Sequence, residues 1–355
     1  MRSEAEYWLN AIGALPPLRA KLMEVCGTHT MSIARAGIKS LLPEGVELLS
    51  GPGCPVCVTP AAVIDRLLEL SGEPGVILAS YGDMLRVPGS RPGDSLQRRR
   101  ALGARVELVY SPVDAVELAQ RSPDKEIVFL GVGFETTAPG TAAAVLTARE
   151  RGVKNFSVWS MLKTVEPALR ALLRQEDFAV QGFLCPGHVA TVIGAEAFRF
   201  LPEEYGLPAV VGGFEPEEIL HALYLILRQL AEGEPKLENA YPRAVRAEGN
   251  PLAQRVIAQC FAPRRELWRG LGMIEASGLG WREEFAAWDA EKKFGVEPPE
   301  AEAPTPCRCG DVICGRCRPA DCPMFWRRCT PEDPVGPCMV SSEGACAAAY
   351  NYQTV

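Results

Sequence analysis

The chain has 355 residues, of which 47% are apolar and 23% charged, as in a folded globular protein rather than a disordered or membrane protein. Its net charge of −7 argues against a nucleic-acid partner, because a phosphate backbone binds a basic surface. The N-terminus lacks the segments of a signal peptide and no apolar run reaches about 18 residues, so we expect a cytoplasmic protein without a membrane span. In that compartment, thirteen cysteines indicate metal binding or redox chemistry rather than a disulfide framework.

Short apolar segments alternate with amphipathic helical segments from about residue 45 to 230, a pattern typical of βαβ units with parallel sheets. The expected strands are residues 46–50, 75–80, 105–110, 127–131, 156–160, 178–184 and 208–213. The expected helices are residues 59–70, 95–102, 112–120, 139–150, 165–173 and 216–230, with one more after Pro186. We divide this region near residue 125 into two Rossmann-like α/β lobes, residues 21–125 and 126–232. Residues 1–20 and 233–355 form the expected third domain.

Four glycine-containing sequences each follow a predicted strand: GPGCPVC, GVGFETTAP, CPGHV and GGFEP. Loops at the carboxyl ends of parallel strands converge on a crevice where ligands bind. Glu135, His188 and Glu215 lie in these loops and are candidates for polar contacts or proton handling in that crevice. The alternative is that each side chain only stabilises its own loop.

CGTHT, at residues 26–30, precedes a sequence with helical spacing of apolar residues, and Thr28 or Thr30 can cap that helix. Cys26 then lies beside a helix N-terminus, where the dipole and free amides lower the pKa of a thiol. We interpret Cys26 as a metal ligand or a nucleophile. A buried structural cysteine is the alternative.

Cys54 and Cys57 have the Cys-x-x-Cys spacing directly after a predicted strand. Such a pair either closes a redox disulfide or supplies two metal ligands, and the spacing does not choose between them. Cys185 and Cys260 lie in apolar segments and are interpreted as core residues.

The segment from Cys307 to Cys346 is rich in cysteine and proline and has no histidine, which suits an iron–sulfur cluster or a cysteine-only zinc site. One candidate set of ligands is Cys307, Cys322, Cys329 and Cys346. A more compact set, with spacing like that of a zinc knuckle, is Cys307, Cys309, Cys314 and Cys317.

Together, CGTHT, GPGCPVC, GFETTAP, PGHV, GGFEP and the tail CPMFWRRCTPEDPVGPCMVSSEGAC resemble the hydrogenase maturation protein HypD family nearly end to end. The resemblance implies a scaffold, or metallochaperone, that assembles the Fe(CN)2CO unit of nickel–iron hydrogenase. Its implied partners are the small chaperone HypC and the cyanide donor HypE, with the chain a monomer in that heteromeric complex. It also implies two α/β lobes and a mainly helical third domain that carries a 4Fe-4S cluster.

The resemblance assigns roles to individual residues. Cys26 becomes the iron ligand that is shared with a HypC cysteine, and His29 is its neighbour. Cys54 and Cys57 flank the iron site as a thiol pair. Glu343, in SSEGAC, is a further candidate functional residue.

For the tail, the resemblance selects Cys307, Cys322, Cys329 and Cys346 as the cluster ligands. Cys314 and Cys317 lie outside the pattern of the family. Cys309 and Cys338 are expected to form a reversible disulfide that exchanges electrons, through the cluster, with the Cys54–Cys57 pair. In this respect the tail resembles ferredoxin–thioredoxin reductase.

Two other functions use the same cysteines. One is a cluster-linked thiol–disulfide reductase, in which the tail passes electrons to Cys54 and Cys57 for an external disulfide substrate. The other is a protein-interaction module whose tail is held together by a bound zinc ion and that has no redox chemistry.

Overall fold

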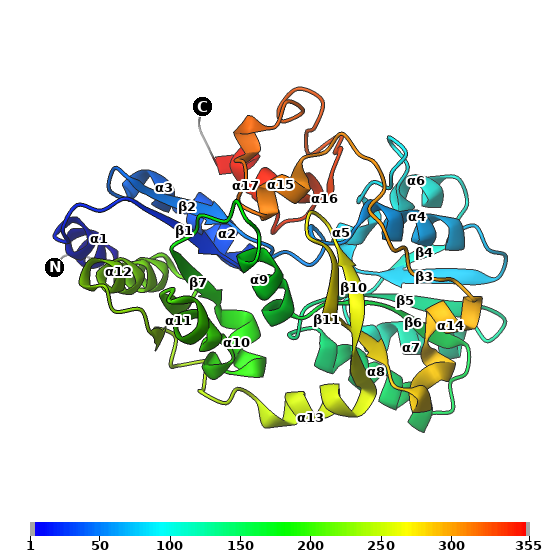
Figure 1. Cartoon of the computed structure of the whole chain (residues 1–355). Helices are drawn as coiled ribbons and strands as arrows, with labels where there is room; N and C mark the ends of the chain where they lie inside the picture. The colour runs from blue at the N-terminus through cyan, green and yellow to red at the C-terminus, as the bar shows by residue number, and fades with distance from the viewer. Residues whose placement is uncertain (1–3, 353–355) are drawn as a thin grey trace.

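The structure, a computed structural model, describes residues 4–352 and contains two parallel β-sheets and one antiparallel hairpin (Figure 1). The first sheet has the strand order β2 (Val46–Ser50), β1 (Ala20–Glu24), β7 (Gly182–Pro186), β8 (Ala209–Gly212) and β9 (Leu237–Asn239). Every residue of β7 and β8 is buried, as in parallel sheets that helices cover on both faces. This first sheet positions most of the candidate site.

Helices surround the first sheet on both sides (Figure 1). They are α1 (Glu4–Gly13), α2 (Gly27–Arg35), α3 (Ile38–Leu41), α10 (Gly187–Ile193), η1 (Ala195–Phe198), α11 (Phe200–Tyr205) and α12 (Pro216–Glu232). The apolar face of α12 packs on β7, β8 and α1. Figure 1 shows α1 and α12 side by side at the end of the molecule that holds the N-terminus.

The second sheet has the strand order β4 (Val106–Leu108), β3 (Val76–Ser80), β5 (Glu126–Gly133) and β6 (Phe156–Leu162). Its helices are α4 (Ala61–Leu70), α5 (Gly82–Leu85), α6 (Leu96–Ala101), α7 (Pro112–Arg121) and α8 (Ala138–Glu150), and α9 (Val165–Leu173) follows β6. A capping box between Ser111 and Asp114, with Pro112 at the first turn, starts α7. The parallel α/β class predicted from the sequence is confirmed.

The boundary expected at residue 125 does not separate the two sheets. The first sheet combines strands from residues 20–50 with strands from residues 182–239, whereas the second sheet uses residues 76–162. The second sheet is therefore inserted between β2 and β7, and it includes strands from both sides of residue 125. Local periodicity identified β2 to β8 but missed β1 and β9. It did not identify which strands are neighbours, because the pairing of β1 with β7 joins segments far apart in sequence.

The region after β9 contains a hairpin that the expectation of a mainly helical third domain did not include. After α13 (Pro251–Cys260) come β10 (Phe261–Trp268), β11 (Gly272–Trp281), η2 (Glu283–Trp288) and α14 (Ala290–Phe294). In β10, whose sequence is FAPRRELW, charged residues interrupt the apolar ones, so the spacing of its apolar residues did not predict a strand. The hairpin packs on α9 and β6, and those contacts decide its conformation.

The cysteine-rich tail forms four short helical turns that lie between the helices of the two sheets (Figure 1). They are α15 (Cys309–Ile313), η3 (Pro319–Asp321), α16 (Pro337–Val340) and α17 (Ala345–Tyr352). α17 packs against α2, and the turn of the hairpin approaches α15 where Gly270 meets Gly310. Within residues 4–352, no helix combines the length and apolar character that a membrane crossing needs.

A buried ionic network ties the hairpin to the second sheet. The ammonium group of Lys163, just after β6, donates to the Leu267 carbonyl at 2.8 Å and lies 3.4 Å from Glu266. Glu266 also pairs with Arg264 at 2.9 Å, and Arg264 pairs with Glu291 of α14. Because these groups are taken out of water, the network is stable only while every charge has its partner.

We predict that Glu266→Gln lowers the free energy of unfolding by about 3–5 kcal/mol, because it leaves Lys163 and Arg264 as buried cations without this carboxylate. The matched control is Glu275→Gln in the same hairpin, where the carboxylate is exposed and lies 3.5 Å from Arg265. It should cost less than about 1 kcal/mol. Urea unfolding followed by circular dichroism measures both, and equal losses would show that the network contributes nothing.

Candidate functional site

Cys26 lies at the end of β1 and begins α2 as its N-cap residue. Neither Thr28 nor Thr30 caps the helix, so that expectation is wrong. The Thr30 hydroxyl instead donates to the Glu24 carboxylate at 2.5 Å, and the Cys26 amide donates to the same carboxylate at 3.1 Å. β1 and the first turn of α2 are thereby joined around a buried carboxyl group.

Cys26 is only 7% exposed, and its surroundings favour the protonated form of the thiol. Burial, together with the negative charge of Glu343, raises its pKa to about 12, although hydrogen bonds from the Thr28 and His29 amides oppose the shift. The expected lowering of this pKa is wrong, because desolvation of the thiolate outweighs the helix N-terminus. The thiol therefore keeps its proton at neutral pH.

Two other titratable groups beside Cys26 are also driven toward their neutral forms. Burial raises the pKa of Glu24 to about 7, although hydrogen bonds from Thr30 and Ser50 favour its carboxylate. Burial lowers the pKa of His29 to about 4. The neutral His29 ring donates from Nε2 to the Gly213 carbonyl at 2.8 Å, and its Nδ1 has no partner within residues 4–352.

His188 reaches the same site from the start of α10. Its Nδ1 lies 3.4 Å from the Thr28 hydroxyl. The rings of His188 and His29 both stack on Phe214, with centroid distances of 3.9 Å and 4.6 Å. The loops after β1, β7 and β8 therefore meet at one place. The positions of the loops after β7 and β8 at strand ends were predicted, whereas the strand before CGTHT was not.

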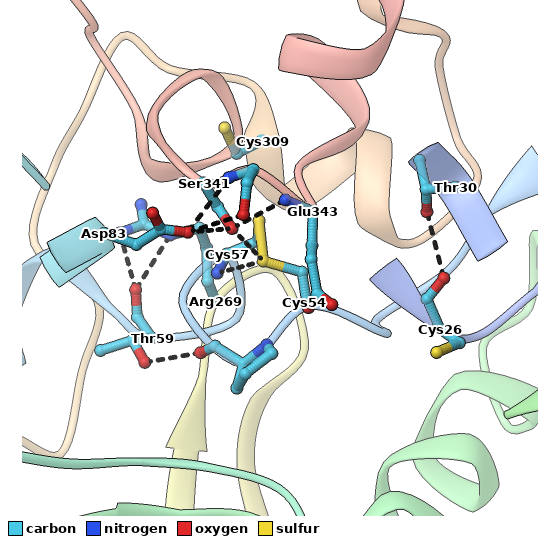
Figure 2. Close-up of a disulfide and its surroundings, with 12 residues drawn as sticks. Cys26, Thr30, Cys54, Cys57, Thr59, Asp83, Arg269, Cys309, Ser341 and Glu343 are labelled. Atoms are coloured by element: carbon cyan, nitrogen blue, oxygen red, sulfur yellow. Dashed lines mark hydrogen bonds between the residues drawn. A yellow bond between two sulfur atoms is a disulfide. The ribbon is translucent and has the colours of Figure 1, made fainter. Parts of the chain in front are cut away.

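The tail supplies Glu343, whose carboxylate accepts a hydrogen bond from the Thr28 hydroxyl at 2.8 Å. Glu343 precedes α17 and approaches the backbone of Gly27, where any side chain would collide with the Glu343 Cβ. Figure 2 shows Glu343 between Cys26 and the disulfide. A residue more than 300 positions from Cys26 thus belongs to its surroundings.

Cys54 and Cys57 form a disulfide in the loop after β2, close to the same segment of the tail (Figure 2). The sulfur of Cys54 lies 3.4 Å from the Ser341 hydroxyl, which is 3.3 Å from the Asp83 carboxylate. The Ser342 amide also donates to Asp83, at 3.1 Å. Residues 341–343 therefore bridge the disulfide and the Cys26 site.

Arg269, in the turn of the hairpin, holds the loop that carries the disulfide. Its guanidinium donates twice to the Thr59 carbonyl, at 2.9 Å and 3.2 Å (Figure 2). It also lies 3.7 Å from Glu302. Sequence reasoning missed Arg269 and Asp83, because neither belongs to a motif. Ser341 was within reach, since it lies beside Glu343 in SSEGAC.

The tail cysteines surround a small pocket that also exposes Met324, Phe325 and Val335. The cysteines that line it are Cys307, Cys309, Cys322, Cys329 and Cys346. All four ligands implied by the family resemblance are in this set. Within residues 4–352, no three side chains of histidine, cysteine, aspartate or glutamate are arranged as a ready-made site for a single metal ion.

The compact, zinc-like set of cysteines is not brought together. The thiol of Cys314 lies 3.5 Å from the Gly270 carbonyl, and Cys317 lines a different groove, between α2 and the tail. Cys314 and Cys317 therefore lie outside the lining of the cysteine pocket.

Cys309 and Cys338 are buried free cysteines whose side chains lie near each other. The pKa of Cys309 is raised well above its usual value by hydrogen bonding to Cys307, and that of Cys338 by hydrogen bonding to Cys309. Both also lie close enough to Cys346 to interact with it. The two thiols that were expected to pair are thus neighbours beside an expected cluster ligand.

Glu135 and Glu215 do not join His188 at the Cys26 site. Glu135 accepts a hydrogen bond from the Val165 amide at 3.0 Å, at the N-terminus of α9, and its other oxygen has no partner within residues 4–352. Glu215 is exposed and caps α12. The two carboxylates have local roles at helix ends. Cys185 and Cys260 are fully buried among apolar side chains, as predicted.

Burial raises the pKa of Glu135 to about 7, so the folded state holds a proton that the unfolded state releases above pH 4.5. Its contribution to stability is complete below pH 4.5 and is lost as the pH rises through 7. We predict that the free energy of unfolding of Glu135→Gln, measured relative to that of the unmutated chain, rises by on the order of 2–3 kcal/mol between pH 4.5 and 8. Urea midpoints across this range test it, and parallel curves for the two proteins would contradict it.

Comparison of the sequence with known proteins shows the family of the chain. The protein-family model HypD, described as the hydrogenase formation hypA family, matches residues 5–353 of the sequence. The chain is 46% identical to the hydrogenase maturation factor HypD of Rhodobacter capsulatus over 346 residues, covering 96% of this chain and 91% of that protein. It is 45% identical to HypD of Escherichia coli K12 over 338 residues, covering 95% and 90%. The chain therefore belongs to the HypD family of hydrogenase maturation factors.

Proposed function

We propose that the chain holds an iron ion at Cys26 while cyanide and carbonyl ligands are added to it. In this role it is a scaffold for the Fe(CN)2CO unit of nickel–iron hydrogenase, with a HypC-like chaperone and a HypE-like cyanide donor as partners. Membership of the HypD family supports the general role in hydrogenase maturation. The observation that carries the finer proposal is the contact of residues 341–343 with both the Cys26 site and the Cys54–Cys57 disulfide.

The surroundings of Cys26 suit a thiolate ligand that forms only when the metal arrives. Without metal, burial keeps the thiol protonated, and a bound cation would replace that proton. The Thr28 and His29 amides then stabilise the thiolate. Thiolate is a soft ligand that suits iron carrying cyanide and carbonyl, and a second thiolate from the HypC-like partner would complete the anchor.

The tail pocket fits a 4Fe-4S cluster better than a single zinc ion. A zinc ion needs its thiolates to converge within about 2.3 Å of one point, whereas each iron of a cluster takes one thiolate at a separate corner. Cys307, Cys322, Cys329 and Cys346 line the pocket without converging, and a side chain at Gly336 would intrude on the sulfur of Cys307. When bound, such a cluster supplies one-electron redox chemistry.

We also propose that Cys309 and Cys338 form a reversible disulfide. Their thiols are neighbours, and oxidising them to a disulfide releases two electrons and two protons. Reduction of the Cys54–Cys57 disulfide takes up the same number. Ser341, three residues after Cys338, contacts Cys54, so a short path of protein connects the two pairs.

The Cys54–Cys57 disulfide also favours the second candidate function, a thiol–disulfide reductase for an external substrate. That function has no need of iron at Cys26. Infrared spectroscopy separates the two, because only the scaffold gives cyanide and carbonyl stretching bands on the purified protein.

We predict that Cys26→Ser, purified with its HypC-like partner, loses the cyanide and carbonyl bands, because a serine hydroxyl does not replace the thiolate as an iron ligand. The tail cluster should keep its iron and sulfide, since it uses other ligands. Cys317→Ser is the control and should retain the infrared bands. Unchanged bands in Cys26→Ser would rule out the assignment.

We predict further that Cys322→Ser abolishes the visible absorbance of the cluster and lowers its iron and sulfide content, whereas Cys317→Ser leaves both unchanged. The two cysteines are five positions apart and both partly buried, so they form a matched pair. The opposite order, with Cys317 essential and Cys322 dispensable, would favour the compact set of ligands.

A further inference from the structure

The loop between Cys322 and Cys329 exposes a tryptophan and two arginines next to the cysteine pocket. Trp326 is 43% exposed, and Arg327 and Arg328 are exposed beside it. Neither arginine side chain makes an ion pair or a hydrogen bond with another part of residues 4–352. We call these three residues the Trp–Arg–Arg surface.

Other arginines of the tail have carboxylate partners. The pairs are Arg308 with Asp311 at 2.9 Å, Arg316 with Asp177 at 3.2 Å and Arg318 with Asp321 at 3.4 Å. The two adjacent positive charges of the Trp–Arg–Arg surface are therefore uncompensated, on a chain whose net charge is −7. An acidic protein is repelled by the molecule as a whole and attracted to this surface.

The backbone holds the tryptophan at the surface in an unfavourable conformation. Trp326 has a φ of 63°, in the left-handed region that bulky residues rarely adopt. The turn is closed by three amides, those of Arg327, Arg328 and Cys329, which all donate to the Met324 carbonyl. Such conformations persist where the surrounding structure imposes them, and they gather at functional sites.

Aromatic rings connect the Trp–Arg–Arg surface with the cysteine pocket. Phe325 lines the pocket, and the Trp326 ring stacks on it with a centroid distance of 5.8 Å. Tyr350 of α17 packs edge-on against both rings, at 6.3 Å and 5.9 Å. A protein that contacts Trp326 would therefore be separated from the pocket only by the ring of Phe325.

We propose that the Trp–Arg–Arg surface docks an acidic one-electron carrier protein of the ferredoxin class. The inference rests on the proposed cluster in the pocket, to which such a carrier would deliver electrons. Tryptophan and arginine are the side chains that contribute most at protein interfaces, and complementary charge speeds the encounter. Reducing the Cys54–Cys57 disulfide to two thiols consumes two electrons and two protons, so two carrier molecules are each oxidised by one electron and solvent supplies the protons.

Binding of an oxidised plant-type 2Fe-2S ferredoxin to the immobilised full chain tests the docking surface. The double variant Arg327→Glu/Arg328→Glu should raise the Kd at least about 10-fold at low salt, and added salt should weaken binding to the unmutated chain. Arg98→Glu/Arg100→Glu, in exposed residues of α6, changes the net charge equally and should leave the Kd within about 2-fold. Trp326→Ala should weaken binding more than Tyr110→Ala, in which a 95% exposed ring is removed.

The rate of cluster reduction provides a second readout. Reduced ferredoxin should reduce the cluster at least about 10-fold more slowly in Arg327→Glu/Arg328→Glu, whereas the reduced methyl viologen cation, which needs no docking, should lose no rate. If both arginine double variants lost affinity for ferredoxin equally, or if ferredoxin did not bind the unmutated chain, the docking inference would be overturned and the proposed function would stand. Iron and sulfide analysis reports separately on the proposed function, and a chain without a cluster would overturn both.

Discussion

The close approach of Glu343 to Gly27 is the contact on which the arrangement of the site depends. Only a residue without a side chain leaves room for the Glu343 Cβ at this position. The contact sets Glu343 against Thr28, lets Ser341 reach Cys54, and accompanies the packing of α17 on α2. The tail is therefore part of the site around Cys26 rather than an appended cysteine-rich module.

Burial determines the charge state of that site. Cys26, Glu24 and His29 each have a pKa that desolvation moves toward the neutral form. The helix N-terminus at Cys26 stabilises a negative charge, but its amides are too few to offset the loss of water. A buried site with neutral groups is suited to a cation that brings its own charge and displaces a proton. It also excludes the water that competes for open coordination positions on a metal.

The hairpin holds together parts of the molecule that do not pair in a common sheet. At one end, Lys163 and Glu266 join it to the second sheet. At its turn, Arg269 binds the loop after the disulfide, and Gly270 meets Gly310 of α15. The disulfide loop and the tail that carries the cysteine pocket are thus both fixed to the turn of the hairpin, which limits their movement relative to each other. Such control of position is what the proposed electron exchange between the cysteine pocket and the disulfide requires.

The sequence by itself determined the local features. Its apolar periods identified strands such as β2, β3, β5 and β8, and its glycine-containing motifs identified the loops at their ends, because those signals depend on neighbouring residues. It also singled out Cys26, His188 and Glu343, which the structure brings to one site. Only the tertiary structure decided that the second sheet interrupts the first, that Glu135 and Glu215 cap helices, and that Arg269 supports the disulfide loop. The same is true of the raised pKa of Cys26. Strand pairing and desolvation arise from segments far apart in sequence, and no local pattern of residues records which segments will meet.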